Sequence, residues 1–410
     1  MTGALDRRLG TGDAVILGLG SMVGAGVFAV WAPAAAAAGS WLLLGLAVAA
    51  GVAWCNASSS AALAVRHPTS GGAYVHGREH LGPWWGFAAG WSFVVGKTAS
   101  CAAMALTVGS YLWPAAARPV AVAAVLVLAA VNYCGITRTA RLTRVLLAGS
   151  LTALAVLVAA LLTRASPDTL VTGAGAAGAG AVLQAGGLLF FAFAGYARIA
   201  TLAEEVRDPA RTIPRAVSVA LPLAVLLYAV VGVGVLAVLG PRRLAGSTAP
   251  LADAMRASEW PGLAWVAVAG AVVAGLGSLL ALVAGVGRTA LAMAREGDLP
   301  RGLVAVHPRF RTPHRAEVAL AVLVSALALT VDLRSVIGFS SFGVLLYYAV
   351  ANASAWTLPA GRRPHRAVPA AGLVGCLLLA ATLPLASVVS GLAVLGAGVA
   401  GRAIAWRHRA

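Results

Sequence analysis

Charged residues are scarce in this 410-residue chain. Asp, Glu, Lys and Arg together make up 10% of it, against about 25% in a soluble globular protein, and 60% of the residues are hydrophobic. A chain with so few charges cannot cover a water-facing surface with polar side chains. The shortage excludes a soluble enzyme, a nucleic-acid-binding domain and a disordered protein, and it predicts a protein that crosses a membrane several times.

The clusters of residues that carry metal or thiol chemistry are also missing. The four cysteines lie apart within apolar runs and form no CxxC pair, so they read as small packing residues. The histidines show no HExxH spacing and have no Cys or carboxylate partner at the centre of an apolar run. We therefore expect no enzymatic activity, no metal site and no cofactor.

Lysine is nearly absent, because 29 of the 30 basic residues are Arg and the remaining one is Lys97. The net charge of +17 does not form a stripe or tail but sits in the short breaks between apolar runs. With the N-terminus placed in the cytoplasm, 22 basic residues fall in inner connections, 6 in outer ones, and Lys97 and Arg198 within spans. This bias follows the positive-inside rule and predicts an inner-membrane protein with both termini cytoplasmic.

Twelve apolar runs approach the roughly 20 residues that a membrane-spanning helix needs. They cover approximately 14–37, 41–65, 84–112, 119–136, 143–163, 181–203, 214–239, 263–288, 316–331, 335–357, 367–385 and 388–405. Such runs are far too long for barrel strands. The predicted fold is an all-α integral membrane protein with about 12 transmembrane helices in a single transmembrane domain, 1–410.

Two of these spans contain glycines at which a helix is expected to break. The first span has four glycines within nine positions: Gly18, Gly20, Gly24 and Gly26. Glycine costs about 1 kcal/mol relative to Ala inside a helix, although close helix packing is an alternative explanation. The sixth span has Gly195 near its middle. Broken helices five spans apart predict a 5+5 inverted repeat, 14–163 and 181–357, with two extra helices over 367–405.

Sequence motifs occur in order along nearly the whole chain. They are GSMVGAGVF at Gly20, HPTSGGAY at His67, NYCG at Asn132, FAFAG at Phe191 with EEVRDPARTIP at Glu204, and RTALAMAREGDLP at Arg288. In these motifs the chain resembles the amino acid–polyamine–organocation (APC) superfamily of permeases, whose members share the LeuT-like fold. The resemblance implies a substrate site at the middle of the membrane, between spans one, three, six, eight and ten.

The resemblance also implies which residues bind the substrate. The backbone amides around Gly24, Ala25 and Gly26 would bind the substrate carboxylate. The carbonyls of Phe191, Ala192, Phe193 and Ala194, with some from the first span, would bind its amino group, and Ser21 is a further candidate substrate-binding residue. Helix breaks suit a zwitterion in this way, because free N–H groups attract an anion and free carbonyls a cation. Phe191 or Phe193 would cover the substrate as an aromatic gate, with ordinary apolar packing as the alternative.

Lys97 is an unusual residue for the middle of a span. It lies 13 residues after Trp84 and 16 before Trp113, which is roughly 20 Å from either end at about 1.5 Å per residue. A charge at this depth must face a polar cavity or lose its proton. It is a candidate proton carrier, a fixed cation in place of sodium, or a partner for an acidic substrate side chain. A structural lysine bonded to carbonyls of the broken helices is the alternative.

Four further residues are candidates for a gate or for support of the site: Arg198, Glu204, Glu205 and Ser278. Arg198 either faces the inner vestibule or extends to the interface, and the two glutamates belong to a mixed-charge loop that is an inner gate or a solvated cluster. Ser278 lies where sodium-dependent relatives of the superfamily supply hydroxyl ligands. Since no second hydroxyl adjoins it, proton coupling or exchange is favoured over sodium coupling.

The sequence thus predicts a secondary active transporter, a multi-pass permease that moves amino acids across the cytoplasmic (inner) membrane by alternating access with proton coupling. Small neutral amino acids are the first expectation, followed by acidic ones. The alternatives are an amino acid exchanger or antiporter, a polyamine or organic-cation carrier, and a substrate sensor that does not transport. The expected partners are the amino acid, a proton and the lipid bilayer, without nucleic acid.

Overall fold

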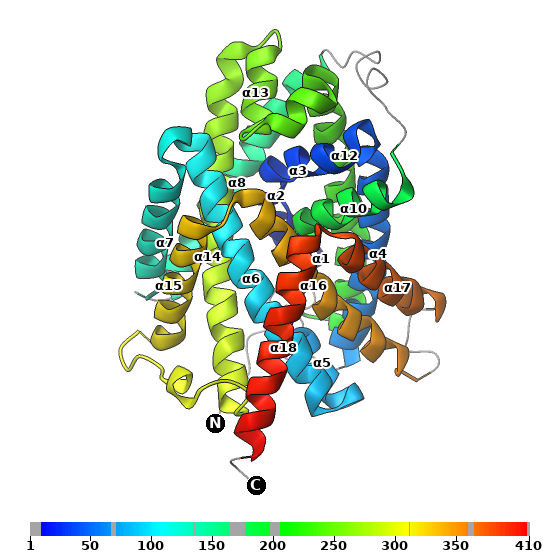
Figure 1. The fold of residues 1–410 in the computed structure, drawn as a ribbon, viewed down its shortest axis with the longest axis vertical. Helices are drawn as coiled ribbons and strands as arrows, with labels where there is room; N and C mark the ends of the chain where they lie inside the picture. Colours follow the sequence, from blue (N-terminus) through cyan, green and yellow to red (C-terminus); the bar gives the residue numbers. More distant parts are fainter. Residues whose placement is uncertain are drawn as a thin grey trace.

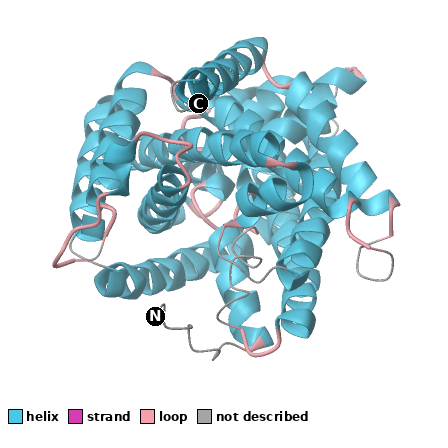
Figure 2. Ribbon diagram, turned by 90° about the horizontal axis from the view of Figure 1, so that it is seen from below, coloured by secondary structure: helices cyan, strands magenta, loops and turns pink. Residues whose placement is uncertain are grey.

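A computed structural model describes residues 10–66, 71–133, 136–163, 177–196, 206–310, 312–359 and 365–407. In these ranges the chain forms helices that are joined by short turns (Figure 1). Seen from below, the helices pack side by side in a bundle (Figure 2).

The helices that the following sections use have these bounds: α1 (Thr11–Met22), α2 (Gly26–Ala29), α3 (Trp31–Ala38), α4 (Leu42–Arg66), α5 (Gly72–Leu81), α6 (Pro83–Leu112), α7 (Ala117–Tyr133), α8 (Ile136–Leu162), α10 (Ala179–Phe193), α12 (Pro209–Gly246), α13 (Pro250–Ala257), α14 (Ala264–Arg295), α15 (His314–Thr330), α16 (Leu333–Trp356), α17 (Ala367–Thr382) and α18 (Leu385–Arg407).

Nine helical stretches of the described residues are long and apolar enough to cross a membrane. They are Thr11–Ala29, Trp31–Arg66, Pro83–Leu112, Pro114–Tyr133, Arg144–Leu162, Pro209–Gly246, Pro261–Arg295, Leu333–Trp356 and Leu385–Ile404, and α10 and α17 are shorter apolar helices. The prediction of an all-helical, multi-pass membrane protein is thereby confirmed. The buried share of these stretches ranges from 83% in α16 to 11% in α18, so α16 lies at the centre and α18 at the periphery.

The centre of the bundle is the contact between α6 and α16. A side chain on Gly343 would lie 2.9 Å from the Cα atom of Gly96, so the two backbones touch where both helices carry glycine. One turn away, the hydroxyls of Ser100 and Ser340 form a hydrogen bond of 2.6 Å. Small residues allow this approach, because helices in a membrane gain their contact energy from close packing and interhelical hydrogen bonds.

Two short helices lie at opposite ends of the bundle, α13 at the upper end of Figure 1 and α5 at the lower end. The second residue of each helix donates its backbone N–H to a tyrosine hydroxyl: Ala73 of α5 to Tyr347 at 3.0 Å, and Leu251 of α13 to Tyr111 at 3.2 Å. The first N–H groups of a helix have no partner within it, so each tyrosine satisfies one of them. The Tyr111 hydroxyl also donates to the carbonyl of Phe28 in α2, at 2.9 Å.

Candidate functional site

The glycine-rich first span is interrupted in the structure. The helix α1 ends at Met22 and α2 begins at Gly26. Only Val30 separates α2 from α3, and its backbone is itself helical (φ −75°, ψ −18°), so Gly26–Ala38 is an almost continuous half-helix. Its first-turn amides are of the kind that a helix start leaves without an intrahelical acceptor.

The end of α10 lies against this interruption. A Cβ atom on Gly26 would lie 2.8 Å from the Cα atom of Ala192, and one on Gly195 would overlap the carbonyl of Ser21. Each glycine is therefore required by the approach of the other segment. The two interpretations of the glycines in the sequence, helix breaking and close packing, both apply to the same place.

The carbonyl oxygens at this junction accept hydrogen bonds from the side chains of Tyr228 and Ser21. The Tyr228 hydroxyl of α12 lies 2.7 Å from the Met22 carbonyl and 3.0 Å from the Ala192 carbonyl, and bridges the two helix ends. The Ser21 hydroxyl donates to Gly195 at 2.8 Å. Tyr228 was not among the predicted residues, although a tyrosine in the middle of an apolar run is a signal for a buried hydrogen bond.

The Lys97 ammonium donates to the carbonyl of Ala194, the C-cap residue of α10, at 3.1 Å. The residue is 6% exposed, and the Tyr348 hydroxyl lies 3.5 Å from the same carbonyl. No ion pair joins Lys97 to a carboxylate within the described ranges. This contact is the one that a structural lysine would make. It also puts the ammonium on a carbonyl that the resemblance assigns to the amino group of the substrate.

The two candidate gate aromatics are both buried. Phe193 is 0% exposed, and its ring packs against that of Tyr228 with the ring centres 5.0 Å apart. This contact corresponds to the packing alternative for Phe193. Phe191 is 7% exposed. A gate role for either side chain stays a prediction.

Ser278 of α14 faces the interrupted first span, because a Cβ atom on Gly24 would overlap its hydroxyl. It is thus close to the residues that the sequence assigns to the substrate carboxylate. The other candidates for a gate, Arg198, Glu204 and Glu205, lie outside the described residues. The structure therefore brings together Ser21, Gly24, Ala25, Gly26, Ala192, Phe193, Ala194, Lys97 and Ser278 around one junction.

A charged network at the lower end of the bundle joins α5, α14 and α18. The Asp298 carboxylate, 4% exposed, lies 2.9 Å from the guanidinium groups of Arg78 and Arg402 and accepts a hydrogen bond from Tyr74 at 2.9 Å. Burial and the charge of Asp298 raise the pKa of the Tyr74 phenol, which keeps it a donor at alkaline pH. Sequence reasoning identified the surrounding motif but not this ion pairing, since the partner arginine of α18 is about a hundred residues away.

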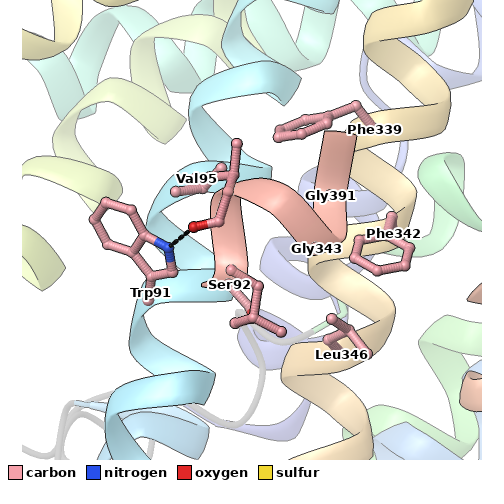
Figure 3. A pocket seen from close by; sticks show the side chains of 10 residues that line it. Trp91, Ser92, Val95, Phe339, Phe342, Gly343, Leu346 and Gly391 are labelled. Atoms are coloured by element: carbon pink, nitrogen blue, oxygen red, sulfur yellow. Dashed lines mark hydrogen bonds between the residues drawn. The ribbon is translucent and has the colours of Figure 1, made fainter. Parts of the chain in front are cut away.

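A pocket between α6, α16 and α18 is separate from this junction (Figure 3). Apolar side chains such as Phe339, Phe342 and Leu346 line it, and the indole of Trp91 donates to the Val394 carbonyl at 2.9 Å. The polar groups at its wall are therefore few and partly satisfied. Such a lining does not suit the two charged ends of a zwitterion.

Comparisons with known proteins agree with this architecture. Residues 9–401 match the profile of a family described as amino acid permease. A protein of Mycobacterium tuberculosis described as an uncharacterized transporter is 63% identical over 399 residues, which is 97% of this chain and 90% of that protein. The human cationic amino acid transporter 4 is 30% identical over 377 residues, 85% of this chain and 59% of the human protein. The branched-chain amino acid permease of Bacillus subtilis is 26% identical over 366 residues, 83% and 78% of the two chains.

Proposed function

This chain belongs to the amino acid permease family, and on that premise we propose that it carries an amino acid across the cytoplasmic membrane by alternating access. The resemblance found in its motifs is confirmed by the family match, and the protein is a transporter, not an enzyme. The observation that carries the proposal is the junction of an interrupted α1–α2 with the end of α10, deep in a bundle of apolar helices.

The proposed topology has twelve spans. The first ten form the inverted repeats 14–163 and 181–357, and the last two, within 367–405, are additional. The interrupted spans one and six then occupy corresponding places in the two repeats, as alternating access about a midplane site requires. The excess of Arg in alternate connections supports placing both termini in the cytoplasm.

The junction offers complementary partners for a zwitterion. The amides of Ala25 and Gly26 stand at the start of the half-helix and carry partial positive charge, which suits the substrate carboxylate. The neighbouring Gly24 N–H donates to the Met22 carbonyl at 2.8 Å. The carbonyls of Phe191–Ala194 end another helix and suit the ammonium. Phe191 is the proposed cover of the site, and Ser278 supports the carboxylate side.

We propose that the transported amino acid has a neutral side chain. In the empty site the Lys97 ammonium lies at the junction without a carboxylate partner in the described residues. A substrate with a cationic side chain would bring a second positive charge, besides its own ammonium, to this buried site. One relative is named a branched-chain amino acid permease and another a cationic amino acid transporter. Lys97 favours the substrate class of the first over that of the second.

We further propose that transport is coupled to protons through Lys97. When a buried lysine loses its proton, the charge of the site around it changes. In the described part of the chain, the carboxylates that form ion pairs lie at helix ends or in connections, where they cannot serve a site at the junction.

The test is uptake of radiolabelled amino acids by proteoliposomes, under inward, outward and zero proton gradients, for the wild type and Lys97→Ala. Ser100→Ala, one turn along the same helix, is the matched control. We expect uptake of a neutral amino acid whose rate depends on the gradient in the wild type and the control, and not in Lys97→Ala. Gradient dependence that survives in Lys97→Ala would refute the coupling role.

Counterflow and net uptake together separate an exchanger, a coupled transporter and a sensor. Vesicles preloaded with unlabelled amino acid accumulate label through an exchanger even without a gradient. A coupled transporter also accumulates label in vesicles that contain no amino acid when a gradient is imposed, whereas an exchanger does not. Absence of both uptake and counterflow for all amino acids would overturn the proposed function and favour a sensor or a carrier of another organic cation.

A further inference from the structure

The carbonyls at the end of α10 that the substrate ammonium would use lie close to donor groups of the protein. The Phe191 carbonyl accepts from the backbone N–H of Ala194 at 3.4 Å, and the Phe193 carbonyl accepts from Tyr196 at 3.2 Å. The Ala192 carbonyl is bonded to the Tyr228 hydroxyl, and the Ala194 carbonyl to Lys97. Each carbonyl of Phe191–Ala194 thus has a protein donor within hydrogen-bond distance, although the one proton of Tyr228 is shared with the Met22 carbonyl. A carbonyl oxygen accepts up to two hydrogen bonds, and both Lys97 and Tyr348 approach that of Ala194.

These donors differ in how readily they can be displaced. The two backbone N–H groups are fixed by the turn that ends the helix, and the Tyr228 ring is buried and packed against Phe193. Lys97 holds its carbonyl through a flexible four-carbon stem. It is also the one donor of these that carries a full charge. An incoming ammonium therefore meets a group of its own kind at Ala194.

We propose that the substrate ammonium and the Lys97 ammonium compete for the Ala194 carbonyl, so that binding of the amino acid drives a proton off Lys97. This inference rests on the proposed function and sets the sign of its proton coupling. When the substrate ammonium reaches Ala194, two like charges would share one acceptor inside a buried site. The proton leaves Lys97 for the aqueous phase to which the site is open, and no covalent bond is made or broken besides this N–H.

The deprotonated side chain fits the bound state. A lysine ammonium has three donors and no acceptor, whereas the neutral amine has a lone pair that can accept a hydrogen bond from the substrate ammonium. The total positive charge at the junction then stays at one, carried by Lys97 in the empty site and by the substrate in the loaded site. A symporter differs, since its proton and substrate bind together.

Among the residues that the structure describes, the other titratable groups near Lys97 do not provide this exchange. Cys101 lies one turn further along α6 and is fully buried. Tyr348 of α16 lies near the same carbonyl, and Tyr228 of α12 bonds the neighbouring one. From α10 no titratable side chain faces Lys97, because Ala179–Phe193 contains none. The phenols and the thiol are neutral groups, so Lys97 is the cation that substrate binding must neutralise.

The experiment measures protons released on binding by purified protein in detergent. L-Leucine, L-alanine, L-arginine and L-glutamate are titrated calorimetrically in two buffers of different ionisation enthalpy, between pH 6 and pH 8.5. For the amino acid that binds, we expect close to one proton released per molecule bound while Lys97 is protonated, and a Kd that falls up to tenfold per pH unit in that range.

Three variants distinguish the groups involved. Lys97→Met has no competing charge, so we expect binding with a Kd independent of pH and without proton release. Lys97→Arg keeps a permanent charge at the carbonyl, and we expect its affinity to fall at least tenfold. Cys101→Ala should keep the proton release of the wild type, which excludes the thiol as its source. Size-exclusion profiles matching the wild type show that each variant is folded.

The possible results separate this inference from the proposed function. Binding accompanied by proton uptake, or by no proton exchange in the wild type, would overturn competition at Ala194 and leave amino acid transport intact. Loss of binding in Lys97→Met with a normal folded profile would also overturn it, because Lys97 would then be a partner of the substrate carboxylate. Failure of all four amino acids to bind to both wild type and Lys97→Met would refute the proposed function itself, and this inference with it.

Discussion

Substitution of Asp298 by Asn tests how the lower end of the bundle is held together. Asp298 and Arg402 are 4% and 8% exposed in their side chains, whereas Arg78 is 26% exposed. The guanidinium of Arg402 also lies 4.6 Å from the ring centre of Trp84 and donates to the Pro83 carbonyl at 2.8 Å. The pair with Arg402 is therefore the buried one, and the pair with Arg78 is partly open to solvent.

The expected losses in the free energy of unfolding follow from this difference in burial. Removing one partner of a buried ion pair costs about 3–5 kcal/mol, because the other charge stays in place without its counterion. A pair near the surface contributes about 0–1 kcal/mol. We expect Asp298→Asn to lower the free energy of unfolding by about 3 kcal/mol, and Arg78→Met by less than about 1 kcal/mol. The Asn side chain keeps an acceptor for Tyr74, so the loss reports the charge.

The double variant Asp298→Asn with Arg402→Met provides the decisive comparison. Met fills the space over Trp84 and carries no charge, so the double variant should be more stable than Asp298→Asn alone. Equilibrium unfolding in mixed detergent micelles measures the wild type, the three single variants Asp298→Asn, Arg78→Met and Arg402→Met, and the double variant. Equal losses for Asp298→Asn and Arg78→Met, or strictly additive losses in the double variant, would show that a buried unpaired arginine is not the cause.

Three shorter predictions concern the junction and the upper end. Gly195→Ala should abolish folded protein or transport, because its Cβ atom would overlap the Ser21 carbonyl; normal uptake by this variant would contradict the close approach. Tyr228→Phe removes the hydroxyl that bridges two helix ends, so we expect a loss of about 1–3 kcal/mol in unfolding and slower uptake, with Km changed less than the maximal rate. Tyr111→Phe leaves the Leu251 N–H without its acceptor, and faster labelling of cysteines introduced beneath α13 should report opening of that end; unchanged labelling would argue against a holding role.

The interruption of the first span could be anticipated from its glycines, since backbone freedom is a property of local sequence. The surface that packs against this interruption could not be anticipated. That Gly26 contacts Ala192, and Gly195 contacts Ser21, depends on residues more than 160 positions away. The sequence therefore indicated where a helix breaks, and only the packed structure explains why a side chain is excluded there.

Lys97 shows the same division between local and distant information. Its depth in the span follows from counting residues between tryptophans, and this made it a candidate without any knowledge of the fold. Its acceptor, the Ala194 carbonyl, belongs to the other repeat of the proposed topology. Tyr228 and Tyr111 were overlooked because a tyrosine in an apolar run looks like core packing until its hydroxyl finds a carbonyl.

The hydrogen bonds by which tyrosine hydroxyls cap α5 and α13 can form only late in the synthesis of the chain. The residue that donates to Tyr347, in α5, precedes it by 274 positions, and Tyr111 precedes its donor in α13 by 140 positions. During translation α5 is therefore synthesised long before Tyr347, the tyrosine that caps it, and Tyr111 is synthesised long before α13, the helix that it caps. These two hydrogen bonds cannot form during most of translation, and the one at α5 cannot form until Tyr347 of α16 has been synthesised.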